Sequence, residues 1–328
     1  MPPSSEIKWA VSSISLGKHP SHTLERKIQA AANNGFQGLE LVYNELLQHA
    51  GSNSQSLVDS ARQIGEFAKK HHVTILALNA FKNFEGHLHI PLEERLKQAQ
   101  EWIDVASSLK TRTIQVPSMF LPESTGDEAI VTSDLQALAD LAAQHGLEIA
   151  YEAVAFGKHN ALWQDAVRVA RAVDRPNFRI CLDSYHIHAR LWGDACAESG
   201  RLPGADQALQ ESLDDFISNC PKELVAYVQL SDASRWAPPL SMDDDAAFEG
   251  LEIRDPRLLW SRVARPFPLE EPGYFPVVDI ARKWLVEYGW GGWVSLEVFL
   301  KETEREENGP EVMARRARDS VEKLLAQI

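Results

Sequence analysis

The chain contains few cysteines, and their spacing fits neither of the common cysteine-based frameworks. Its 328 residues include three cysteines, Cys181, Cys196 and Cys220, which are odd in number and show no CxxC spacing. The sequence therefore indicates neither a disulfide scaffold nor a zinc–thiolate site. Such a composition suits a reducing, intracellular environment.

Positive charge and long apolar runs are also scarce. The chain has 33 basic against 47 acidic residues, a net charge of −14, which argues against unaided binding to nucleic acid or to anionic membranes. No apolar run approaches the roughly 18 residues of a membrane helix, and the amino-terminal MPPSSEIKW lacks the basic and apolar regions of a secretion signal. We therefore expect a cytoplasmic protein, and the sequence leaves both a monomer and a homo-oligomer open.

What the chain does contain is a regular alternation of strand-like and helix-like segments. Strands are expected at about 9–16, 38–43, 74–80, 113–117, 147–153, 178–184, 224–231 and 293–299. Amphipathic helices are expected at about 23–35, 54–72, 90–110, 127–146, 159–173, 204–219, 274–288 and 310–327. Eight such pairs predict a single closed (β/α)8 TIM barrel over residues 1–328. The alternative is an open doubly wound sheet, which normally has a GxGxxG turn after its first strand, where this chain has SLGKHPSH.

One long segment, at about 233–273, shows neither pattern and is rich in proline and acidic residues. Segments longer than about 15 residues without regular structure are usually functional or disordered in compact domains. Because this one follows the seventh predicted strand, it lies on the side of the barrel where active sites are found. We expect an extended lid loop over the barrel mouth.

Four predicted strands each end in one oxygen-bearing side chain. These side chains are Glu152, Asp183, Gln229 and Glu297, on strands five to eight. Burying unpaired carboxylates is costly, so their presence at apolar strand ends indicates a cation or a bound substrate. An oxygen-only set favours one hard divalent ion, Mg2+ or Mn2+, with Co2+ as a third candidate. Taken singly, each side chain could also be an ordinary polar residue at a strand end.

Two further residues are candidates for catalysis. His186 lies three residues beyond Asp183, and histidine titrates near neutral pH, so it could move protons beside the predicted metal. The alternative for His186 is a surface or supporting role. Glu40 ends the second predicted strand and is a candidate base or ligand-orienting group, or else the partner of a nearby Lys or Arg.

The predicted lid and one helix supply candidates for substrate binding. Ser261, Arg262 and Arg265 form a Ser-Arg-x-x-Arg pattern in the segment 233–273. In so acidic a chain, arginines near an anionic metal site suggest capture of a substrate carboxylate by a planar guanidinium, although a solvated basic stretch gives the same pattern. Arg95, near the start of the predicted helix at 90–110, is a further candidate, with a surface ion pair as the alternative.

Several segments together resemble the 3-dehydroshikimate dehydratases of quinate and shikimate breakdown, within the xylose isomerase-like barrel superfamily. These segments are GFQGLELVYNEL, RPNFRICLDSYHI, AYVQLSDA, WSRVARPFP and GWVSLEVF, and the likeness extends over nearly the whole chain. Gln229 in VQLSDA and the Ser-Arg-x-x-Arg pattern make the chain resemble the dehydratases more than other members of the superfamily. Sugar epimerases and isomerases of this barrel type usually have a His at the position of Gln229. Some relatives have a second, dioxygenase-like domain, which we do not expect here because the chain ends after the eighth predicted helix.

The resemblance implies an activity and a set of roles. The implied roles are metal ligation by Glu152, Asp183, Gln229 and Glu297, proton transfer by His186, and substrate binding by Ser261 and Arg265. The implied reaction is loss of water from the small carboxylate 3-dehydroshikimate to give protocatechuate, through a metal-stabilised enolate. Alternatives are a sugar or hydroxy-ketone isomerase or epimerase, a metal-free binding protein, and an apurinic-site nuclease. The nuclease is disfavoured because it needs several metal-binding His residues and a basic face.

Overall fold

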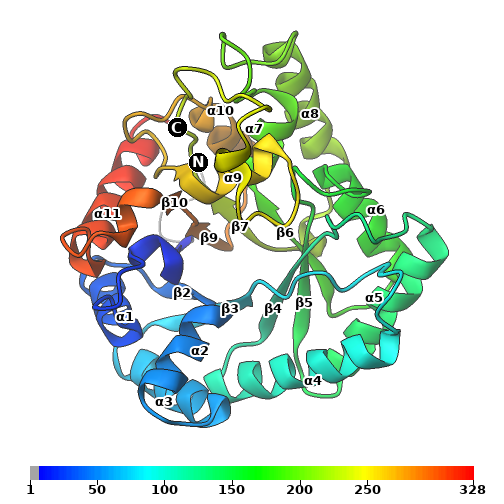
Figure 1. The fold of residues 1–328 in the computed structure, drawn as a ribbon, viewed down its shortest axis with the longest axis vertical. Helices are drawn as coiled ribbons and strands as arrows, with labels where there is room; N and C mark the ends of the chain where they lie inside the picture. The colour runs from blue at the N-terminus through cyan, green and yellow to red at the C-terminus, as the bar shows by residue number, and fades with distance from the viewer. Residues whose placement is uncertain (1–6) are drawn as a thin grey trace.

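The computed structural model describes residues 7–328 as a closed barrel of eight parallel strands surrounded by helices (Figure 1). The barrel strands are β1 Lys8–Ser12, β2 Gly38–Val42, β3 Thr74–Asn79, β4 Thr113–Pro117, β5 Glu148–Glu152, β6 Phe178–Asp183, β7 Val225–Leu230 and β9 Trp293–Leu296. Each pairs with its neighbour in chain order, and β9 closes the barrel against β1. The predicted (β/α)8 barrel is confirmed, and the open doubly wound alternative is wrong.

Helices cover the outside of the barrel. They are α1 Leu24–Asn33, α2 Tyr43–Ser52, α3 Leu57–Lys70, α4 Leu92–Leu109, α5 Glu128–Ala143, α6 Trp163–Val173, α7 Ser184–Leu191, α8 Ala205–Asn219, α9 Pro256–Val263, α10 Val277–Ala281 and α11 Pro310–Leu325. Helix α10 continues as a π-helical stretch, Arg282–Glu287. Helices α2 and α7 begin at the residue after strands β2 and β6. The sequence did not predict these two helices.

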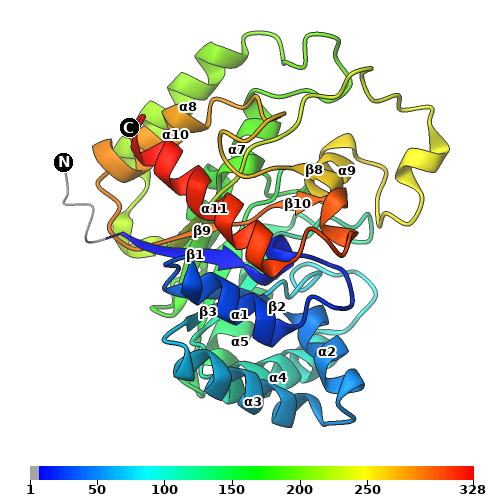
Figure 2. The ribbon, with the colours of Figure 1, turned by 90° about the vertical axis from the view of Figure 1, so that its left-hand side faces the viewer.

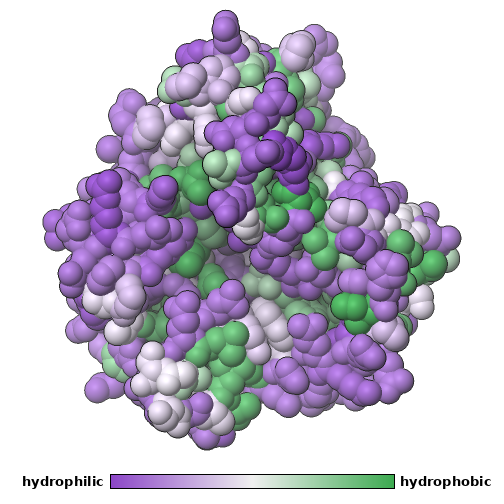
Figure 3. Space-filling view, in the orientation of Figure 1, coloured by the Kyte–Doolittle hydropathy of each residue, from purple (hydrophilic) through white to green (hydrophobic). Residues whose placement is uncertain are grey.

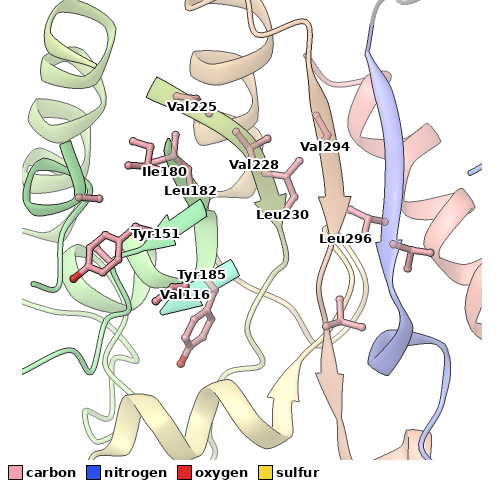
Figure 4. Close-up of a cluster of buried hydrophobic side chains, with 14 of the residues drawn as sticks. Val116, Tyr151, Ile180, Leu182, Tyr185, Val225, Val228, Leu230, Val294 and Leu296 are labelled. Atoms are coloured by element: carbon pink, nitrogen blue, oxygen red, sulfur yellow. The ribbon is translucent and has the colours of Figure 1, made fainter. Parts of the chain in front are cut away.

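Alternate residues along each strand pack on opposite faces, as the two-residue period of a strand requires. The outward side chains of β5, β6, β7 and β9, among them Tyr151, Ile180, Val228 and Val294, belong to the main hydrophobic core beneath the helices (Figure 4). A second, small cluster inside the barrel is made mainly of strand residues: Ala10, Leu76, Ala77, Ala150, Cys181 and Tyr227. Polar residues placed two positions further along these strands must therefore point into the barrel.

The first strand ends earlier than predicted. Its last paired residue is Ser12, which pairs with Glu40, and a 3-10 turn follows at Ser13–Leu16. The Ser13 hydroxyl accepts a hydrogen bond from the Val42 amide at 3.0 Å, which replaces a strand-to-strand hydrogen bond. The chain therefore leaves the first strand after Ser12, at the carboxyl end of the barrel.

The segment 233–273 is not wholly irregular, so that part of the prediction is wrong. It contains a 3-10 turn at Asp245–Phe248, helix α9, and the short strand β8 at Ala264–Arg265. Strand β8 pairs in antiparallel fashion with β10 at Phe299–Leu300, just after the last barrel strand. Figure 2 shows α9 and β8 extending beyond the barrel strands. This two-stranded contact ties the segment to the carboxyl end of β9.

The face seen in Figure 3 is mostly hydrophilic, with separate hydrophobic patches rather than one continuous apolar surface. Among residues 7–328, no helix combines the length and the apolar character needed to cross a membrane. None of Cys181, Cys196 and Cys220 forms a disulfide.

Candidate metal centre and active site

The four strand-end residues all point into the barrel at its carboxyl end. Ala150, Cys181 and Tyr227 lie in the inner cluster, so Glu152, Asp183 and Gln229, two positions further on, share that face. Asp183 pairs with Gln229, and Gln229 with Ser295, which places Glu297 two residues beyond on the same inner face. The strand period therefore brings all four residues to one region.

Glu152, Asp183 and His186 form the most compact group of this region. One possible ligand atom from each lies within 4.8 Å of the others, and all three side chains are buried. His186 Nε2 lies 3.6 Å from Glu152 Oε1 and 3.6 Å from Asp183 Oδ2. Helix α7 places His186 here because it begins directly after Asp183, whose side chain caps it by accepting the Tyr185 amide at 2.8 Å.

Arg265 brings a positive charge into the same cluster. Its Nη2 donates to Asp183 Oδ2 at 2.6 Å and to the Glu297 carbonyl at 3.1 Å, while Nη1 lies 3.5 Å from Glu297 Oε2. Its Nε donates to the Ser231 hydroxyl at 3.1 Å. The guanidinium also lies against Tyr185, with 4.5 Å from Cζ to the ring centroid. Arg265 is 1% exposed, so its position is set by protein contacts on every side.

Gln229 makes its hydrogen bonds with Glu40 and Cys181 rather than with Glu152, Asp183 or His186. Its Nε2 donates to the two Glu40 oxygens at 2.9 and 3.2 Å, and its Oε1 accepts from Cys181 Sγ at 3.3 Å. Glu40 is fully buried and also accepts from Asn79 Nδ2 at 3.4 Å. Glu40 is therefore placed to orient Gln229, and the amide oxygen of Gln229 points toward Cys181 in this arrangement.

Burial raises the pKa of every carboxyl group in this region. For Glu152, the neighbouring charges of Asp183 and Glu297 add to the effect of burial and hold the pKa well above its usual range. For Glu297, burial raises the pKa to about 8, although Arg265 opposes the shift. Burial likewise raises the pKa of Asp183, again against Arg265, and of Glu40. The protein thus holds these carboxylates close together at an electrostatic cost that a cation would relieve.

The surroundings of His186 favour its neutral form. Burial, together with the charges of Arg265 and Arg262, lowers its pKa well below the usual value. Its Nδ1 accepts the Ala155 amide at 3.1 Å, so the neutral ring has its proton on Nε2, the nitrogen that faces Glu152 and Asp183. At 3.6 Å, the contacts from Nε2 to Glu152 Oε1 and Asp183 Oδ2 are longer than hydrogen bonds.

Comparison with known proteins agrees with this fold. Residues 28–323 match the profile of the family described as xylose isomerase-like TIM barrel. The chain belongs to this family. A 3-dehydroshikimate dehydratase of Neurospora crassa is 33% identical over 328 residues, covering 93% of this chain and 89% of the relative. A 3-dehydroshikimate dehydratase of Pseudomonas putida is 29% identical over 89% of this chain, but this chain covers only 38% of that relative.

Solved structures show the same architecture. A fusion protein of such a barrel with a 4-hydroxyphenylpyruvate dioxygenase superposes with a TM-score of 0.76 and 26% identity, over 98% of this chain and 43% of that chain. A structure described as IOLI protein with a binding zinc atom superposes with a TM-score of 0.69 and 17% identity, over 97% of this chain and 98% of that chain. The predicted resemblance to the family is confirmed. The similarity to the IOLI protein, at 17% identity, concerns the fold alone.

The donor set in this xylose isomerase-like barrel fits a divalent cation. Glu152 Oε1 is buried and has no hydrogen-bond partner within residues 7–328, while its Oε2 accepts from the Gln115 side chain. Unpaired buried carboxylate oxygens are costly, and coordination by a cation is one way to satisfy them. Glu152, Asp183 and His186 could hold one such ion. Gln229 and Glu297 lie in the same region but contact Glu40, Cys181 and Arg265 here.

The predicted substrate-binding residues fall into three different environments. Ser261 is buried, and its hydroxyl accepts from Arg265 Nη1 at 3.3 Å. Arg262 is partly exposed and lies 3.3 Å from Glu252. Arg265 is not a free guanidinium at the mouth, because Asp183, Ser231 and Glu297 occupy its donors. In this arrangement Arg265 is a fixed counter-charge within the acidic cluster, and its role in binding a substrate carboxylate stays a prediction.

Arg95 is neither on the helix surface nor beside the acidic cluster. It is 6% exposed, and Nη1 lies 2.7 Å from Asp134 of α5, while Nε donates to the Ile90 carbonyl at 3.0 Å. Its guanidinium also lies 5.4 Å from the ring centroid of Phe84. These contacts fasten the connection between β3 and α4, and they differ from both roles that the sequence suggested.

Sequence reasoning missed three residues of this region, namely Asn79, Gln115 and Ser231. Asn79 and Gln115 face the barrel interior from β3 and β4 and contact Glu40 and Glu152. A signal was present, because each interrupts an otherwise apolar strand, TILALN or TIQVP, at an inward position. Ser231 gives no comparable signal in the sequence. Its part in this region is to accept hydrogen bonds from Arg265, a contact that depends on how the distant segment 233–273 folds.

Asp232 holds the base of the segment 233–273. Its Oδ1 accepts the amides of Ala233 and Phe275, both at 2.8 Å, and its Oδ2 accepts the Leu269 amide at 3.3 Å. The two ends of the segment thus meet at one buried carboxylate. Asp232 therefore holds the segment 233–273 and makes no hydrogen bond to the acidic cluster within residues 7–328.

Proposed function

We propose that this chain removes water from 3-dehydroshikimate to give protocatechuate, with one divalent cation held at the carboxyl end of the barrel. Two observations support the proposal. The chain is 33% identical to a 3-dehydroshikimate dehydratase over 93% of its length. Its buried, inward-pointing acidic cluster also has the composition of a site for a hard cation. Of the two, the buried cluster of Glu152 and Asp183 beside His186 is the observation on which the proposed chemistry depends.

The charge balance of the cluster favours a doubly charged ion. Glu152, Asp183, Glu297 and the buried Glu40 carry four negative charges when ionised, and Arg265 supplies one positive charge from the same buried volume. One dication neutralises two of the remaining three negative charges. Oxygen donors favour Mg2+ or Mn2+, with Co2+ as a third candidate.

In the proposed reaction, the substrate loses a proton from the carbon next to its ketone and hydroxide from the following carbon. One water leaves, and a further shift of a ring hydrogen gives the aromatic product. A bound dication supplies polarisation of the ketone, which makes the neighbouring C–H bond more acidic. The fixed charge of Arg265 opposes the rise in the pKa of Asp183 and Glu297 that burial causes, and its contacts hold both side chains in place.

His186 is the proposed proton carrier at the departing hydroxyl group. Its Nε2 bears the proton in the neutral ring and faces the cluster, whereas Nδ1 is held by the Ala155 amide. This arrangement favours hydrogen-bond donation from Nε2 to the leaving oxygen. Ser261 and Arg262, on the lid helix α9, are the proposed contacts to polar groups of the substrate.

The proposal is tested by incubating the purified protein with 3-dehydroshikimate after chelation and after adding back Mg2+, Mn2+ or Co2+ singly. We expect protocatechuate, followed by its ultraviolet absorption, only when an ion is present. Conversion of 3-dehydroshikimate that is equally fast after exhaustive chelation contradicts the metal dependence. No protocatechuate under any of these conditions contradicts the dehydratase function.

The second candidate is a sugar or hydroxy-ketone isomerase or epimerase. An inosose isomerase of Bacillus velezensis is 24% identical over 171 residues, or 51% of this chain, which supports keeping this alternative. An isomerase keeps every atom of its substrate, so mass spectrometry of the products separates the two functions. Loss of 18 mass units, that of one water, is expected only for the dehydratase.

A further inference from the structure

A cavity lies at the amino end of the barrel, where the strands begin. Its volume of about 420 Å³ is within the range of small-molecule sites, and its lining includes the first residues of β3, β4, β5 and β9, namely Thr74, Thr113, Glu148 and Trp293. Figure 2 shows β1 beginning on the side of the barrel away from α9 and β8. Glu148 and Glu152 stand at opposite ends of β5, roughly 13 Å apart at the rise of a strand. This cavity, which we call the amino-end cavity, is therefore separate from the acidic cluster.

The inner wall of the amino-end cavity is apolar and aromatic. Leu76 and Tyr227, from the small cluster inside the barrel, line the cavity, and Trp293 packs against the same cluster. Gly38 at the start of β2 makes room for Trp293, because a Cβ atom there would lie 2.7 Å from Cζ3 of the indole. Lys8 Nζ lies over the Trp293 ring, 5.4 Å from its centroid. The aromatic side chains form a surface that can cover a flat organic group.

The charged residues that line this cavity are mostly basic. They are Lys110, Arg112 and Arg179, against one acidic residue, Glu148, among the residues from 7 to 328. Glu148 already has partners, since Thr113 Oγ1 donates to its Oε1 at 2.8 Å and Arg179 Nη1 donates to its Oε2 at 3.4 Å. Arg179 and Glu148 therefore balance each other, and the charges of Lys110 and Arg112 remain.

Lys110 and Arg112 have no carboxylate partner for these charges. Both side chains are exposed, and neither makes a hydrogen bond or an ion pair within the part of the chain that the structure describes. Their backbones are fixed, because the Lys110 amide donates to the Ser107 carbonyl at 3.2 Å and the Arg112 carbonyl accepts the Glu148 amide at 2.7 Å. The carboxyl end of α4 favours a cation at Lys110, but Arg112 lies beyond that helix. Two unbalanced cations at one cavity, in a chain whose net charge is −14, point to a doubly charged anion as their partner.

We propose that the amino-end cavity binds a small organic phosphate ester. Lys110 and Arg112 hold the phosphoryl group, and Trp293 and Tyr227 cover the organic part. A phosphate monoester carries a charge of about −1.5 to −2 at pH 7, which matches the two unbalanced cations better than the single charge of a carboxylate does. The planar guanidinium of Arg112 can donate two parallel hydrogen bonds to phosphate oxygens. The inference does not depend on the proposed function, because no residue of the acidic cluster takes part in this binding.

The test is isothermal titration calorimetry with phenyl phosphate, which joins a phosphate dianion to a flat ring. Phenyl sulfate has nearly the same shape but one negative charge, and inorganic phosphate lacks the ring. We expect the wild type to bind phenyl phosphate at least about 10-fold more tightly than either, because each lacks one charged contact or one buried ring. Equal affinity for phenyl sulfate contradicts recognition by two cations, and equal affinity for inorganic phosphate contradicts the role of Trp293 and Tyr227. No binding of phenyl phosphate up to about 10 mM overturns the inference.

Two variants, Arg112→Gln and Lys110→Gln, locate the binding site in the chain. Each should weaken the binding of phenyl phosphate by about 10-fold or more, the effect of losing one charged hydrogen bond. Arg315→Gln is the matched control, because Arg315 is exposed on α11 and its side chain likewise has no hydrogen bond or ion pair within residues 7–328. This control should bind phenyl phosphate as the wild type does. Circular dichroism establishes that every variant is folded, and wild-type affinity in both Arg112→Gln and Lys110→Gln overturns the inference.

Glu152→Gln separates the amino-end cavity from the acidic cluster, because phosphate groups also bind divalent cations. We expect Glu152→Gln to bind phenyl phosphate as the wild type does. Loss of binding in Glu152→Gln, with normal binding in Arg112→Gln and Lys110→Gln, assigns the anion to the metal site and overturns the inference. Formation of protocatechuate is measured separately, and its absence contradicts the proposed function without changing the result for the amino-end cavity.

Discussion

Replacing one carboxylate of the acidic cluster should stabilise the metal-free protein while abolishing activity. Glu152 is 3% exposed, and one of its oxygens has no hydrogen-bond partner in the described chain. Its nearest possible ligand atom lies within 4.8 Å of that of Asp183, so two ionised groups repel by roughly 3 kcal/mol at an effective dielectric constant of about 20. Protonation already relieves part of this repulsion. We expect Glu152→Gln to raise the free energy of unfolding by about 1–3 kcal/mol in the presence of a chelator.

The change of stability with pH shows independently whether the Glu152 carboxylate destabilises the metal-free protein. Burial and neighbouring carboxylates raise the pKa of Glu152 above its unfolded value. A group of this kind lowers stability once the pH exceeds its unfolded pKa, so metal-free wild type should gain stability as the pH falls from about 8 toward about 5. Glu297, with a pKa of about 8, contributes to the same window. In Glu152→Gln the gain should be smaller, because one of the titrating groups is absent.

The assay is urea unfolding followed by tryptophan fluorescence, at several pH values, with and without Mn2+. Glu66→Gln is the matched control, since Glu66 is exposed on α3. Mn2+ should stabilise wild type and Glu66→Gln but not Glu152→Gln, and kcat/KM of Glu152→Gln should fall by at least about 10³-fold. If Glu152→Gln is less stable than wild type under chelation, or if its pH slope equals that of wild type, the electrostatic reasoning is wrong.

Three further predictions concern the ion, the proton carrier and the lid. Chelation should lower the melting temperature of wild type as well as its activity, and an unaltered melting temperature would speak against a bound ion. His186→Gln should lower kcat by about 10²- to 10⁴-fold with KM nearly unchanged, and stopped-assay kinetics showing normal kcat would remove its role. Asp232→Asn should weaken the hydrogen bonds that Asp232 accepts from Ala233 and Phe275 and lower the free energy of unfolding by about 1–3 kcal/mol. The segment 233–273 should then be cleaved faster by protease than in the wild type. Equal cleavage rates in the variant and the wild type would disprove the anchoring role of Asp232.

The strands and their inward-facing residues were predictable because both follow from local pattern. Apolar runs separated by amphipathic helices specify a barrel, and the two-residue period of a strand fixes which side chains point inward. Glu152 and Asp183 could therefore be placed together from the sequence. Their spacing to His186 follows from a helix that begins at the next residue after the strand.

The contacts of the arginines were not predictable in the same way. Arg95 and Arg265 each sit in segments that look exposed, yet each is buried against a carboxylate distant in the sequence, Asp134 and Asp183. A long, charged side chain can reach many partners, and its partner depends on how the surrounding loops fold. The helix within the segment 233–273 was missed for a related reason, since it is stabilised by packing rather than by a long amphipathic repeat.

By itself, the sequence determined that a ring of parallel strands would present oxygen-bearing side chains at its carboxyl end, because strand period and connection order are properties of neighbouring residues. Only the tertiary structure decided which charges meet there. It placed Arg265 among the carboxylates and turned Gln229 toward Glu40. Those outcomes depend on distances between segments that are remote along the chain, and no local pattern encodes such distances.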